Sequence, residues 1–271
     1  MTNLGGRTAL ITGASSGIGR EFARQLHSLG CNLVVTARRM ERLIELKQEL
    51  ERFRPDSVEC VAADLTKRSS NGDNLLGLEE LVSRLEKIPI DIFINNAGVG
   101  SFGPFEKIPS EYENNIILLN IYATTMLAQF VINKMKASRQ GMYLCVSSIA
   151  GFQPLPFMAT YSASKAFNLF QTLALRYELR GYNISVTALC PGPTETEFFG
   201  VAQLAAQPPD LRRAEVQDVV NESIRAMLKN KAVVAPGWKG KLMVLVVRFL
   251  PLSITTTFSG RFLGKCLPKS G

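Results

Sequence analysis

The chain has 271 residues, of which 46% are hydrophobic and 20% charged, and its formal net charge is +8. This composition excludes a disordered or low-complexity protein, and the length favours one large α/β domain over two small ones. The N-terminus has no apolar stretch behind a basic start, so we expect no signal peptide and a cytoplasmic protein.

Cysteine and histidine give no sign of a metal site. The five cysteines have no CxxC spacing, and four of them lie in apolar runs typical of strands, so we expect buried, reduced thiols without disulfides. They are Cys31, Cys60, Cys145, Cys190 and Cys266. The single histidine, His27, is expected on a helix surface.

Strand-like and helical segments alternate along the first 235 residues. Residues 8–12 and 32–37 are rich in β-branched and apolar side chains, and between them Ile18, Phe22 and Leu26 share one helical face. Further strands are expected at 58–64, 90–96, 141–148, 184–192 and 232–237, and further helices at 40–53, 78–87, 111–138, 160–181 and 215–230. The pattern predicts a doubly wound, Rossmann-type parallel sheet of about seven strands with helices on both faces.

Two segments interrupt this alternation. Residues 66–77 are polar and predict a surface insertion, and residues 194–214 form a long connection that we expect to act as a mobile lid. No linker divides the chain before residue 235. We therefore expect one domain over 1–235 and an appendage over 236–271.

The motif TGASSGIG, residues 12–19, lies between the first strand and the first helix. Glycines at 13, 17 and 19 allow a sharp turn and a close approach of the backbone to a pyrophosphate at the helix N-terminus. A tight turn without a ligand is the alternative. Strand before and helix after favour a dinucleotide site.

The end of the second strand indicates which dinucleotide. An NAD site usually has an acid here, whereas this chain has Arg38 and Arg39. A guanidinium can hold a 2′-phosphate in a forked geometry, so the sequence favours NADP(H), with Arg38 as the main contact. The alternative is that both arginines begin the next helix and face solvent.

Residues after the third and fourth strands fall on the same sheet edge. Asp64 is placed to accept from the adenine amino group, and Ala97 and Gly98 let a ribose approach the backbone. Taken alone, either Asp64 or the Ala97–Gly98 pair could equally be part of an ordinary turn.

The segment YSASK, residues 161–165, places Tyr161 and Lys165 on one helical face. The unperturbed phenol pKa is about 10, and a cation one turn away favours the phenolate, so we expect Lys165 to lower the pKa of Tyr161. Such a pair can exchange a proton with a carbonyl or alcohol oxygen. Ser147 and Ser148 end the fifth strand, where a hydroxyl can orient that oxygen.

Over about residues 5–236 the chain resembles the short-chain dehydrogenase/reductase family, through TGASSGIG, AAD, NNAG, Asn120, SSIAG, YSASK and CPGPTET in this order. The resemblance implies that Tyr161 is the acid/base, Lys165 its cationic partner, Ser148 the orienting hydroxyl and Asn120 the anchor of a water relay. For Asn120 a structural bridge is the alternative. The implied cofactor contacts are Gly13, Ser15, Ser16, Gly17, Ile18, Gly19, Arg38, Asp64, Leu65, Asn96, Ala97, Gly98, Tyr161, Lys165, Pro191, Gly192 and Thr196.

The C-terminal appendage carries the whole net charge. From Lys229 onward there are eight basic residues and no acid, which leaves 23 basic against 23 acidic residues in the rest of the chain. The apolar run 242–252 is too short to span a membrane and is interrupted by Arg248 and Pro251. A lid over the substrate, a subunit interface and an anionic membrane surface are the three hypotheses for it. Nucleic-acid binding fits worse, because few aromatics accompany the basic residues.

These observations predict an NADP(H)-dependent oxidoreductase that interconverts a carbonyl and a secondary alcohol. Residues 99–106, 149–158 and 194–207 are rich in Phe, Leu, Met and Pro, so a hydrophobic substrate is expected, such as an oxoacyl chain, steroid, retinoid or aromatic ketone. A cofactor-binding regulator or scaffold without turnover is the rival hypothesis, and dehydratase or epimerase chemistry is another. The resemblance also implies a homo-oligomer paired through the helices that carry Asn120 and Tyr161.

Overall fold

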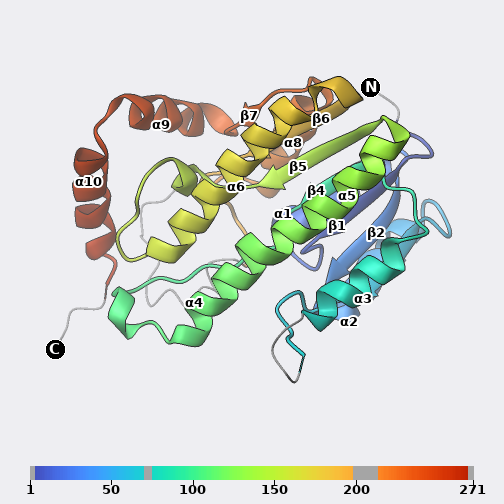
Figure 1. Ribbon diagram of the computed structural model, residues 1–271, viewed down its shortest axis with the longest axis horizontal. Coiled ribbons are helices and arrows are strands. Elements are labelled where there is room, and N and C mark those ends of the chain that lie inside the picture. Colours follow the sequence, from blue (N-terminus) through green and yellow to red (C-terminus); the bar gives the residue numbers. More distant parts are fainter. Residues whose placement is uncertain (1–3, 70–74, 198–212, 268–271) are drawn as a thin grey trace.

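The computed structural model describes residues 4–69, 75–197 and 213–267. Seven parallel strands form one sheet in the order β3-β2-β1-β4-β5-β6-β7, which confirms the predicted fold class (Figure 1). The strands are β1 (Thr8–Thr12), β2 (Asn32–Ala37), β3 (Val58–Ala62), β4 (Ile92–Asn95), β5 (Gly141–Val146), β6 (Ile184–Leu189) and β7 (Val233–Val234). Several end up to three residues before the predicted ends, because the residues that follow form the loops of the site.

Helices cover both faces of the sheet, as expected for strands that are apolar on both sides. Along β1, Ala9 and Ile11 join one core cluster and Leu10 joins the other, which follows the alternation of side chains in a strand. The first cluster packs under α1 (Gly17–Ser28), α2 (Met40–Glu51) and α8 (Val216–Leu228). On the opposite face lie α3 (Leu76–Leu85), α5 (Thr124–Ser138) and α6 (Ala159–Glu178).

The predicted helix 111–138 forms as one continuous rod from Ser110 to Ser138. It consists of α4 (Ser110–Ile116), a π-helical stretch η2 (Ile117–Ala123) and α5. By length and composition alone this helix is apolar enough to cross a membrane, since its most apolar 18-residue window has a mean hydropathy of 1.6. Since 44% of its most apolar window is buried inside the protein, packing on the sheet accounts for much of this character.

Two sequence predictions concern the long connections. One needs correction, and the other falls mostly on residues outside the described part of the chain. The segment 66–77 is not wholly a surface insertion, because Leu75 is 6% exposed and pairs with Arg68 in a short bridge that leads into α3. Of the expected lid 194–214, residues 198–212 lie outside the described residues.

His27 is buried, and the expected surface position is wrong. Its side chain is 6% exposed, and its Nε2 lies 2.8 Å from the Ser57 hydroxyl, because the last turn of α1 packs against the start of β3. Burial lowers the pKa of His27 below its ordinary value. All five cysteines are free, and four of them are buried, as expected.

The C-terminal appendage folds into two helices that the sequence analysis did not predict. They are α9 (Gly237–Phe249) and α10 (Leu252–Gly264), joined at Pro251. Proline fits the beginning of a helix, where its missing N–H is not needed, so Pro251 starts α10 rather than only ending the apolar run. In Figure 1 the two helices extend along one side of the domain.

Candidate active site

A cleft of about 1620 Å³ runs along the carboxyl ends of the strands. It is lined by every site residue that the sequence predicted except Gly19 and Asn120, which lie behind its wall. The cleft therefore brings the glycine loop, the two arginines and the Ser148, Tyr161 and Lys165 side chains to one edge of the sheet, as ligand sites in open α/β sheets require.

The glycine loop has the geometry that the motif predicts. Gly13 and Gly17 have φ angles of +67° and +53°, which strongly favour glycine. A Cβ at residue 19 would lie 2.4 Å from the carbonyl oxygen of Gly13, so any side chain there would displace the loop. The backbone can thus approach a ligand closely at the N-terminus of α1.

Asn96 ties the loop after β4 to the glycine loop. Its amide donates to the carbonyl oxygen of Thr12 at 2.8 Å, and the hydroxyl of Thr12 accepts from the backbone N–H groups of Asn96 and Ala97, both at 2.9 Å. The side chain of Asn96 therefore holds two walls of the cleft together. On the next strand end, Asp64 accepts from the backbone and hydroxyl of Thr66 at 3.0 and 2.7 Å.

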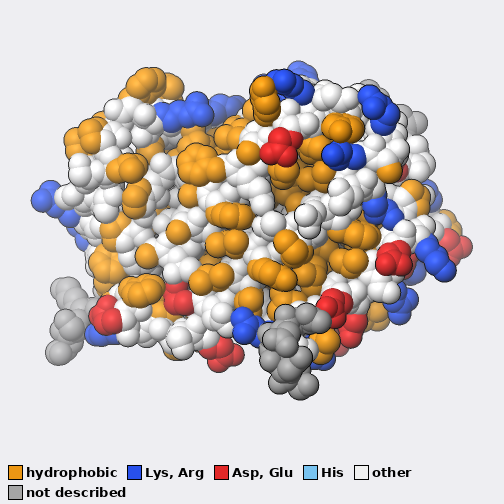
Figure 2. Space-filling model, in the orientation of Figure 1, with side chains coloured by type: hydrophobic (Ala, Val, Ile, Leu, Met, Phe, Trp, Pro, Cys, Tyr) orange, Lys and Arg blue, Asp and Glu red, His pale blue; other side chains and the backbone are white. Residues whose placement is uncertain are grey.

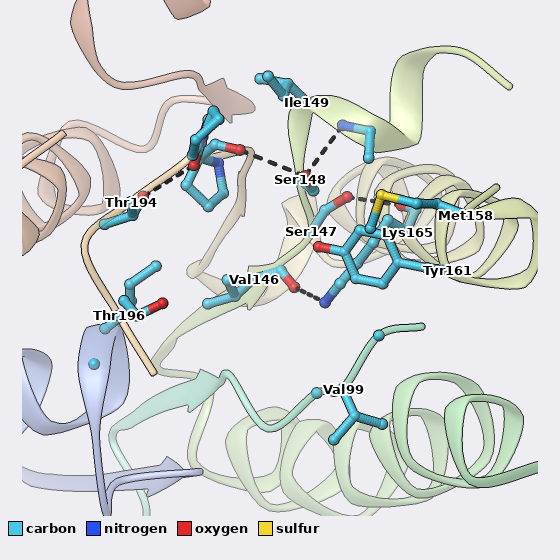
Figure 3. A pocket seen from close by; sticks show the side chains of 18 of the residues that line it. Val99, Val146, Ser147, Ser148, Ile149, Met158, Tyr161, Lys165, Thr194 and Thr196 are labelled. Carbon is cyan, nitrogen blue, oxygen red and sulfur yellow. Dashed lines mark hydrogen bonds between the residues drawn. The ribbon is translucent and has the colours of Figure 1, made fainter. Parts of the chain in front are cut away.

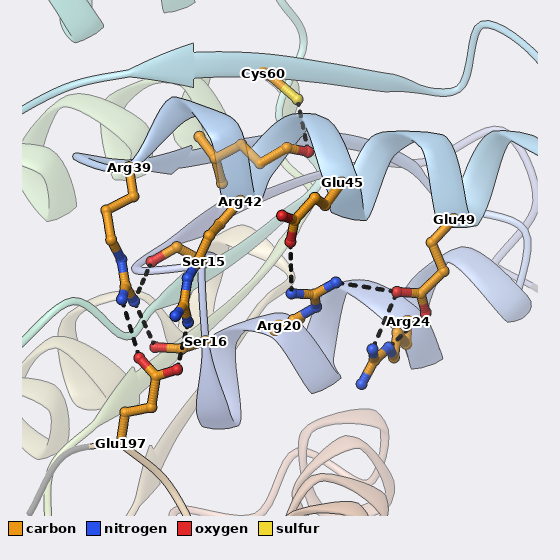
Figure 4. A network of polar contacts seen from close by, with 11 residues as sticks. Ser15, Ser16, Arg20, Arg24, Arg39, Arg42, Glu45, Glu49, Cys60 and Glu197 are labelled. Carbon is orange, nitrogen blue, oxygen red and sulfur yellow. Dashed lines mark hydrogen bonds and ion pairs between the residues drawn. The ribbon is translucent and has the colours of Figure 1, made fainter. Parts of the chain in front are cut away.

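Of the two arginines at the end of β2, Arg39 is the one that contacts the glycine loop (Figure 4). Its guanidinium donates to the hydroxyls of Ser15 and Ser16 at 3.1 and 3.2 Å, whereas Arg38 is exposed at the cleft wall. Glu197 accepts from Arg39 at 3.0 Å and also from Arg42. The hydrogen bonds from Arg42 and Arg39 hold the pKa of Glu197 below its ordinary value.

The sequence analysis singled out Arg38 and missed the roles of Arg39 and Glu197. The pair Arg38–Arg39 was visible in the sequence, but the strand end alone does not say which side chain turns toward the glycine loop. Glu197 follows Thr196 in the motif CPGPTET, and its ion pairs with α2 have no signal in the sequence.

The two serines after β5 have different partners (Figure 3). Ser147 donates to the carbonyl oxygen of Lys165 at 2.7 Å and so anchors α6 to the strand. Ser148 caps the short helix η3 (Ile149–Phe152) by accepting from the backbone of Ala150 at 3.1 Å, and its hydroxyl also bonds to Tyr161. Ser148 is therefore the serine that faces the tyrosine, as the sequence predicted.

Tyr161 and Lys165 lie on one face of α6 and are 8% and 4% exposed. Burial raises the pKa of Tyr161 to about 12, while the hydrogen bond with Ser148 acts in the opposite direction. Lys165 donates to the carbonyl oxygen of Val146 at 2.9 Å, and its Nζ lies 5.8 Å from the centroid of the Tyr161 ring. Burial lowers the pKa of Lys165 below its ordinary value.

The pKa of Tyr161 is raised, whereas the sequence analysis expected it to be lowered. The spacing in YSASK correctly predicts a cation near the ring, but this ammonium group donates to the backbone of β5, and burial is the largest influence on the pKa of Tyr161. The hydrogen bond with Ser148 favours the phenolate.

Asn120 is fully buried within η2 and uses its amide to connect three elements. Its Oδ1 accepts from the backbone of Val99 at 3.0 Å, and its Nδ2 donates to the carbonyl oxygen of Val99 and the hydroxyl of Ser164, both at 2.9 Å. The structural bridge that the sequence left open is thus present. Its role in a water relay stays a prediction.

The predicted substrate walls line the cleft. Phe102, Leu155 and Met158 come from the expected ranges, and of the third range Thr194, Thr196 and Glu197 are among the described residues that line it. Helices α9 and α10 also line the cleft, as the lid hypothesis for the appendage anticipates, and supply Leu242, Val246, Ile254, Phe258 and Phe262, among others.

A family model for the short chain dehydrogenases matches residues 7–206. The chain belongs to the short-chain dehydrogenase/reductase family. A solved member from Sphingobium yanoikuyae, determined in complex with NADPH, is 31% identical, superposes with a TM-score of 0.79, and is covered over 97% of its length by 98% of this chain. Family membership supports an NAD(P)-binding oxidoreductase that acts on CH–OH groups.

Curated relatives in this family differ in length and description. An uncharacterized oxidoreductase of Myxococcus xanthus is 31% identical over 251 residues, which are 93% of this chain and 95% of that protein. A very-long-chain 3-oxoacyl-CoA reductase of Kluyveromyces lactis is 37% identical over 188 residues, or 67% of this chain. The match spans about half of that reductase, 53% of its length.

Proposed function

We propose that this short-chain dehydrogenase/reductase is an NADP(H)-dependent enzyme that interconverts a hydrophobic ketone and the corresponding secondary alcohol. The observation that carries the proposal is the convergence of Ser148, Tyr161 and Lys165 in an apolar cleft beside the glycine loop. The three groups could orient an oxygen atom and move a proton to or from it.

The residues around the glycine loop fit a dinucleotide. A Cβ at residue 19 or residue 13 would fill the space against Gly13 or Asn96, so a close backbone approach is built into the loop. Arg39, held by Ser15 and Ser16, and the exposed Arg38 provide guanidinium groups at the end of β2, where a 2′-phosphate would need them. When bound, the nicotinamide supplies or accepts the hydride.

The protein groups supply the proton. A phenol with a pKa of about 12 is protonated at neutral pH, so Tyr161 can donate a proton to the oxygen of a ketone that is being reduced. The hydroxyl of Ser148 reaches Tyr161 and can bond the same oxygen. Lys165 places a positive charge one turn away, which favours the phenolate that forms after the proton has left.

The walls of the cleft support a hydrophobic substrate. Phe102, Leu155 and Met158 pack around Tyr161, and the side chains of α9 and α10 extend this apolar lining outward. A site of this size with few polar groups favours a large ketone over a sugar. The matched reductase of Kluyveromyces lactis is described as acting on very-long-chain 3-oxoacyl-CoA, so a 3-oxoacyl thioester is one candidate.

The experiment that tests the proposal follows NADPH oxidation with a panel of 3-oxoacyl thioesters, steroid ketones, aromatic ketones and small sugars. We expect turnover of hydrophobic ketones, and a fall in kcat/KM of about 10²- to 10⁴-fold in Tyr161→Phe because a general acid is lost. Binding of NADPH, measured by calorimetry, should be retained in this variant. Activity confined to small polar sugars would contradict the proposal.

The cofactor preference is tested in the same assay with NADH. Loss of a charge-assisted hydrogen bond costs about 1.5–3 kcal/mol, so Arg39→Ala and Arg38→Ala should each weaken NADPH binding by roughly 10- to 100-fold and leave NADH binding nearly unchanged. Arg84→Ala, at an arginine on α3, is the control. Tight NADPH binding without reduction of any ketone would favour the regulator hypothesis instead.

A further inference from the structure

Helix α9 presents its apolar side to solvent. Trp238, Leu242, Leu245 and Phe249 are spaced by four, three and four residues and therefore share one face, which we call the α9 face. Their side chains are 70%, 50%, 55% and 80% exposed. The one buried residue of α9, Val247, is two positions from Leu245 and from Phe249, about 200° around the axis. The helix thus packs through the side opposite its most apolar face.

This exposure is unusual within the molecule. Of the twenty large hydrophobic side chains that are exposed in the described part of the chain, eleven lie between Trp238 and Phe262. Soluble monomers seldom expose contiguous apolar patches of this kind without a partner. The lid hypothesis explains only part of it, because Leu245, Phe249 and Leu252 do not line the active-site cleft.

The charged side chains of α9 itself are all positive, and one of them pairs with an acid of α8. Lys239 lies over the Trp238 ring at 5.6 Å, Lys241 pairs with Glu222 of α8, and Arg248 is exposed next to Phe249. Arg261 and Lys265 follow on and after α10. In Figure 2, hydrophobic and basic side chains lie together at the upper left, where Figure 1 places α9.

We propose that the α9 face inserts into the interface of an anionic phospholipid bilayer. Apolar side chains flanked by lysine and arginine are the combination that binds such a surface. A second copy of the chain fits worse, because a two-fold contact through α9 would oppose two basic segments, and no acid occurs from Lys229 to the end. Charge complementarity therefore favours lipid phosphates.

The active-site cleft borders this face, because Trp238 and Leu242 of the face also line the cleft. Ile254, Phe258 and Phe262, at positions i, i+4 and i+8 of α10, line the cleft, as do Leu242 and Val246 of α9. An apolar compound dissolved in the bilayer could therefore enter between the two helices without crossing water. Membrane binding itself does not depend on the proposed catalytic function.

The test measures binding of the full chain to vesicles of phosphatidylcholine, alone or mixed with phosphatidylglycerol. Trp238 is the single tryptophan of the chain, so its fluorescence reports on the α9 face directly. We expect flotation with the anionic vesicles, a blue shift of the tryptophan emission, and weaker binding at high salt.

The variants separate this face from other exposed side chains. The double variant Leu245→Ser, Phe249→Ser should weaken vesicle binding at least about tenfold, since it removes two large apolar groups. Phe53→Ser is the matched control, because Phe53 is 84% exposed and follows α2. Unchanged melting temperatures would show that each variant is folded.

Three results would overturn the proposal. The first is no flotation and no blue shift with either vesicle. The second is equal binding to neutral and anionic vesicles at all salt concentrations, or an equal loss in Phe53→Ser. The third is an oligomer that dissociates in the Leu245→Ser, Phe249→Ser variant while vesicles do not bind, which would make the α9 face a protein interface.

Discussion

Burial keeps the phenol of Tyr161 protonated far above neutral pH. The raised pKa means that the folded protein holds this proton more tightly than the unfolded chain, whose tyrosines titrate near about 10. The corresponding stabilisation is complete below about pH 10 and is lost as the pH rises toward the folded pKa of about 12. The lowered pKa of Lys165 has the opposite effect on the pH dependence of stability. Lys165 is present both in the natural protein and in a variant at residue 161, so its effect cancels when the two are compared.

The alkaline stability of the protein should therefore depend on Tyr161. Between pH 9 and pH 11, the free energy of unfolding of the natural protein should fall by roughly 1 kcal/mol more than that of Tyr161→Phe. Urea unfolding at a series of pH values measures this difference. Tyr177→Phe is the matched control, at a tyrosine that is 66% exposed. Parallel pH profiles for the natural protein and Tyr161→Phe would contradict the assignment of the raised pKa.

At the scale of residues, the sequence predicted which side chains lie together but not how the site shifts the pKa of Tyr161. The spacing of YSASK and the serines after the fifth strand were enough to bring Ser148, Tyr161 and Lys165 together. The degree of burial and the bond from Lys165 to Val146 depend on tertiary packing, so the sign of the shift in the Tyr161 pKa could not be predicted.

At the scale of elements, the π-helical stretch η2 positions Asn120 against the loop after β4. Such stretches are rare inside α-helices and are frequently found at functional sites. The hydrophobic pattern of 111–138 correctly predicted a long helix. It gave no sign of the wider turn, nor of the contacts that Asn120 makes there with Val99 and Ser164.

Removal of the Asn120 side chain should loosen this connection. Asn120→Ala removes the hydrogen bonds from the buried Asn120 side chain to the backbone N–H and carbonyl of half-buried Val99, at a cost of about 0.5–1.5 kcal/mol for each bond. A lower melting temperature in calorimetry measures the loss. Asn114→Ala, at an exposed position of α4, is the control. Equal melting temperatures for the two variants would show that the bridge contributes nothing.

The appendage shows where element prediction from sequence failed. Arg248 and Pro251 interrupt the apolar run of the sequence, yet each fits a helical structure, since Arg248 is exposed on α9 and Pro251 begins α10. A place at the cleft was one of three hypotheses for this segment, but the sequence did not predict that the segment would form two helices there. That placement comes from packing against the loop 154–157, to which Ser259 donates at the carbonyl oxygen of Pro154.

For the whole molecule, the alternation of strands and helices correctly predicted a doubly wound parallel sheet. The strand order β3-β2-β1-β4-β5-β6-β7 then brings residues from distant parts of the chain to one edge. A single chain does not reveal its assembly, however, and the expected homo-oligomer stays a prediction.

We propose that a second copy covers the face formed by α5, η2 and α6. Phe167, Phe170 and Tyr177 form a stripe along α6 and are 38%, 66% and 66% exposed, with Tyr122 of η2 beside them at 46%. Figure 2 shows hydrophobic side chains over the face where Figure 1 places α5 and α6. This surface carries an apolar stripe of the kind found in the core of subunit interfaces.

A substitution on this stripe should shift the oligomeric state. We expect the natural protein to elute as a dimer or tetramer in light-scattering chromatography and Phe170→Asp to elute at a lower mass, because a buried charge without a partner is costly. Phe53→Asp, at an exposed phenylalanine outside the stripe, should leave the mass unchanged. A monomeric natural protein would refute the expectation.

The two ends of the chain supply different parts of the cleft. The glycine loop, the arginines and Asp64 come from the first third of the sequence, whereas α9 and α10 come from its last part and bond to Glu222 and Pro154 rather than to those residues. Substrate range can therefore change by exchange of residues 237–264 as a cassette, with the machinery for the dinucleotide inherited intact.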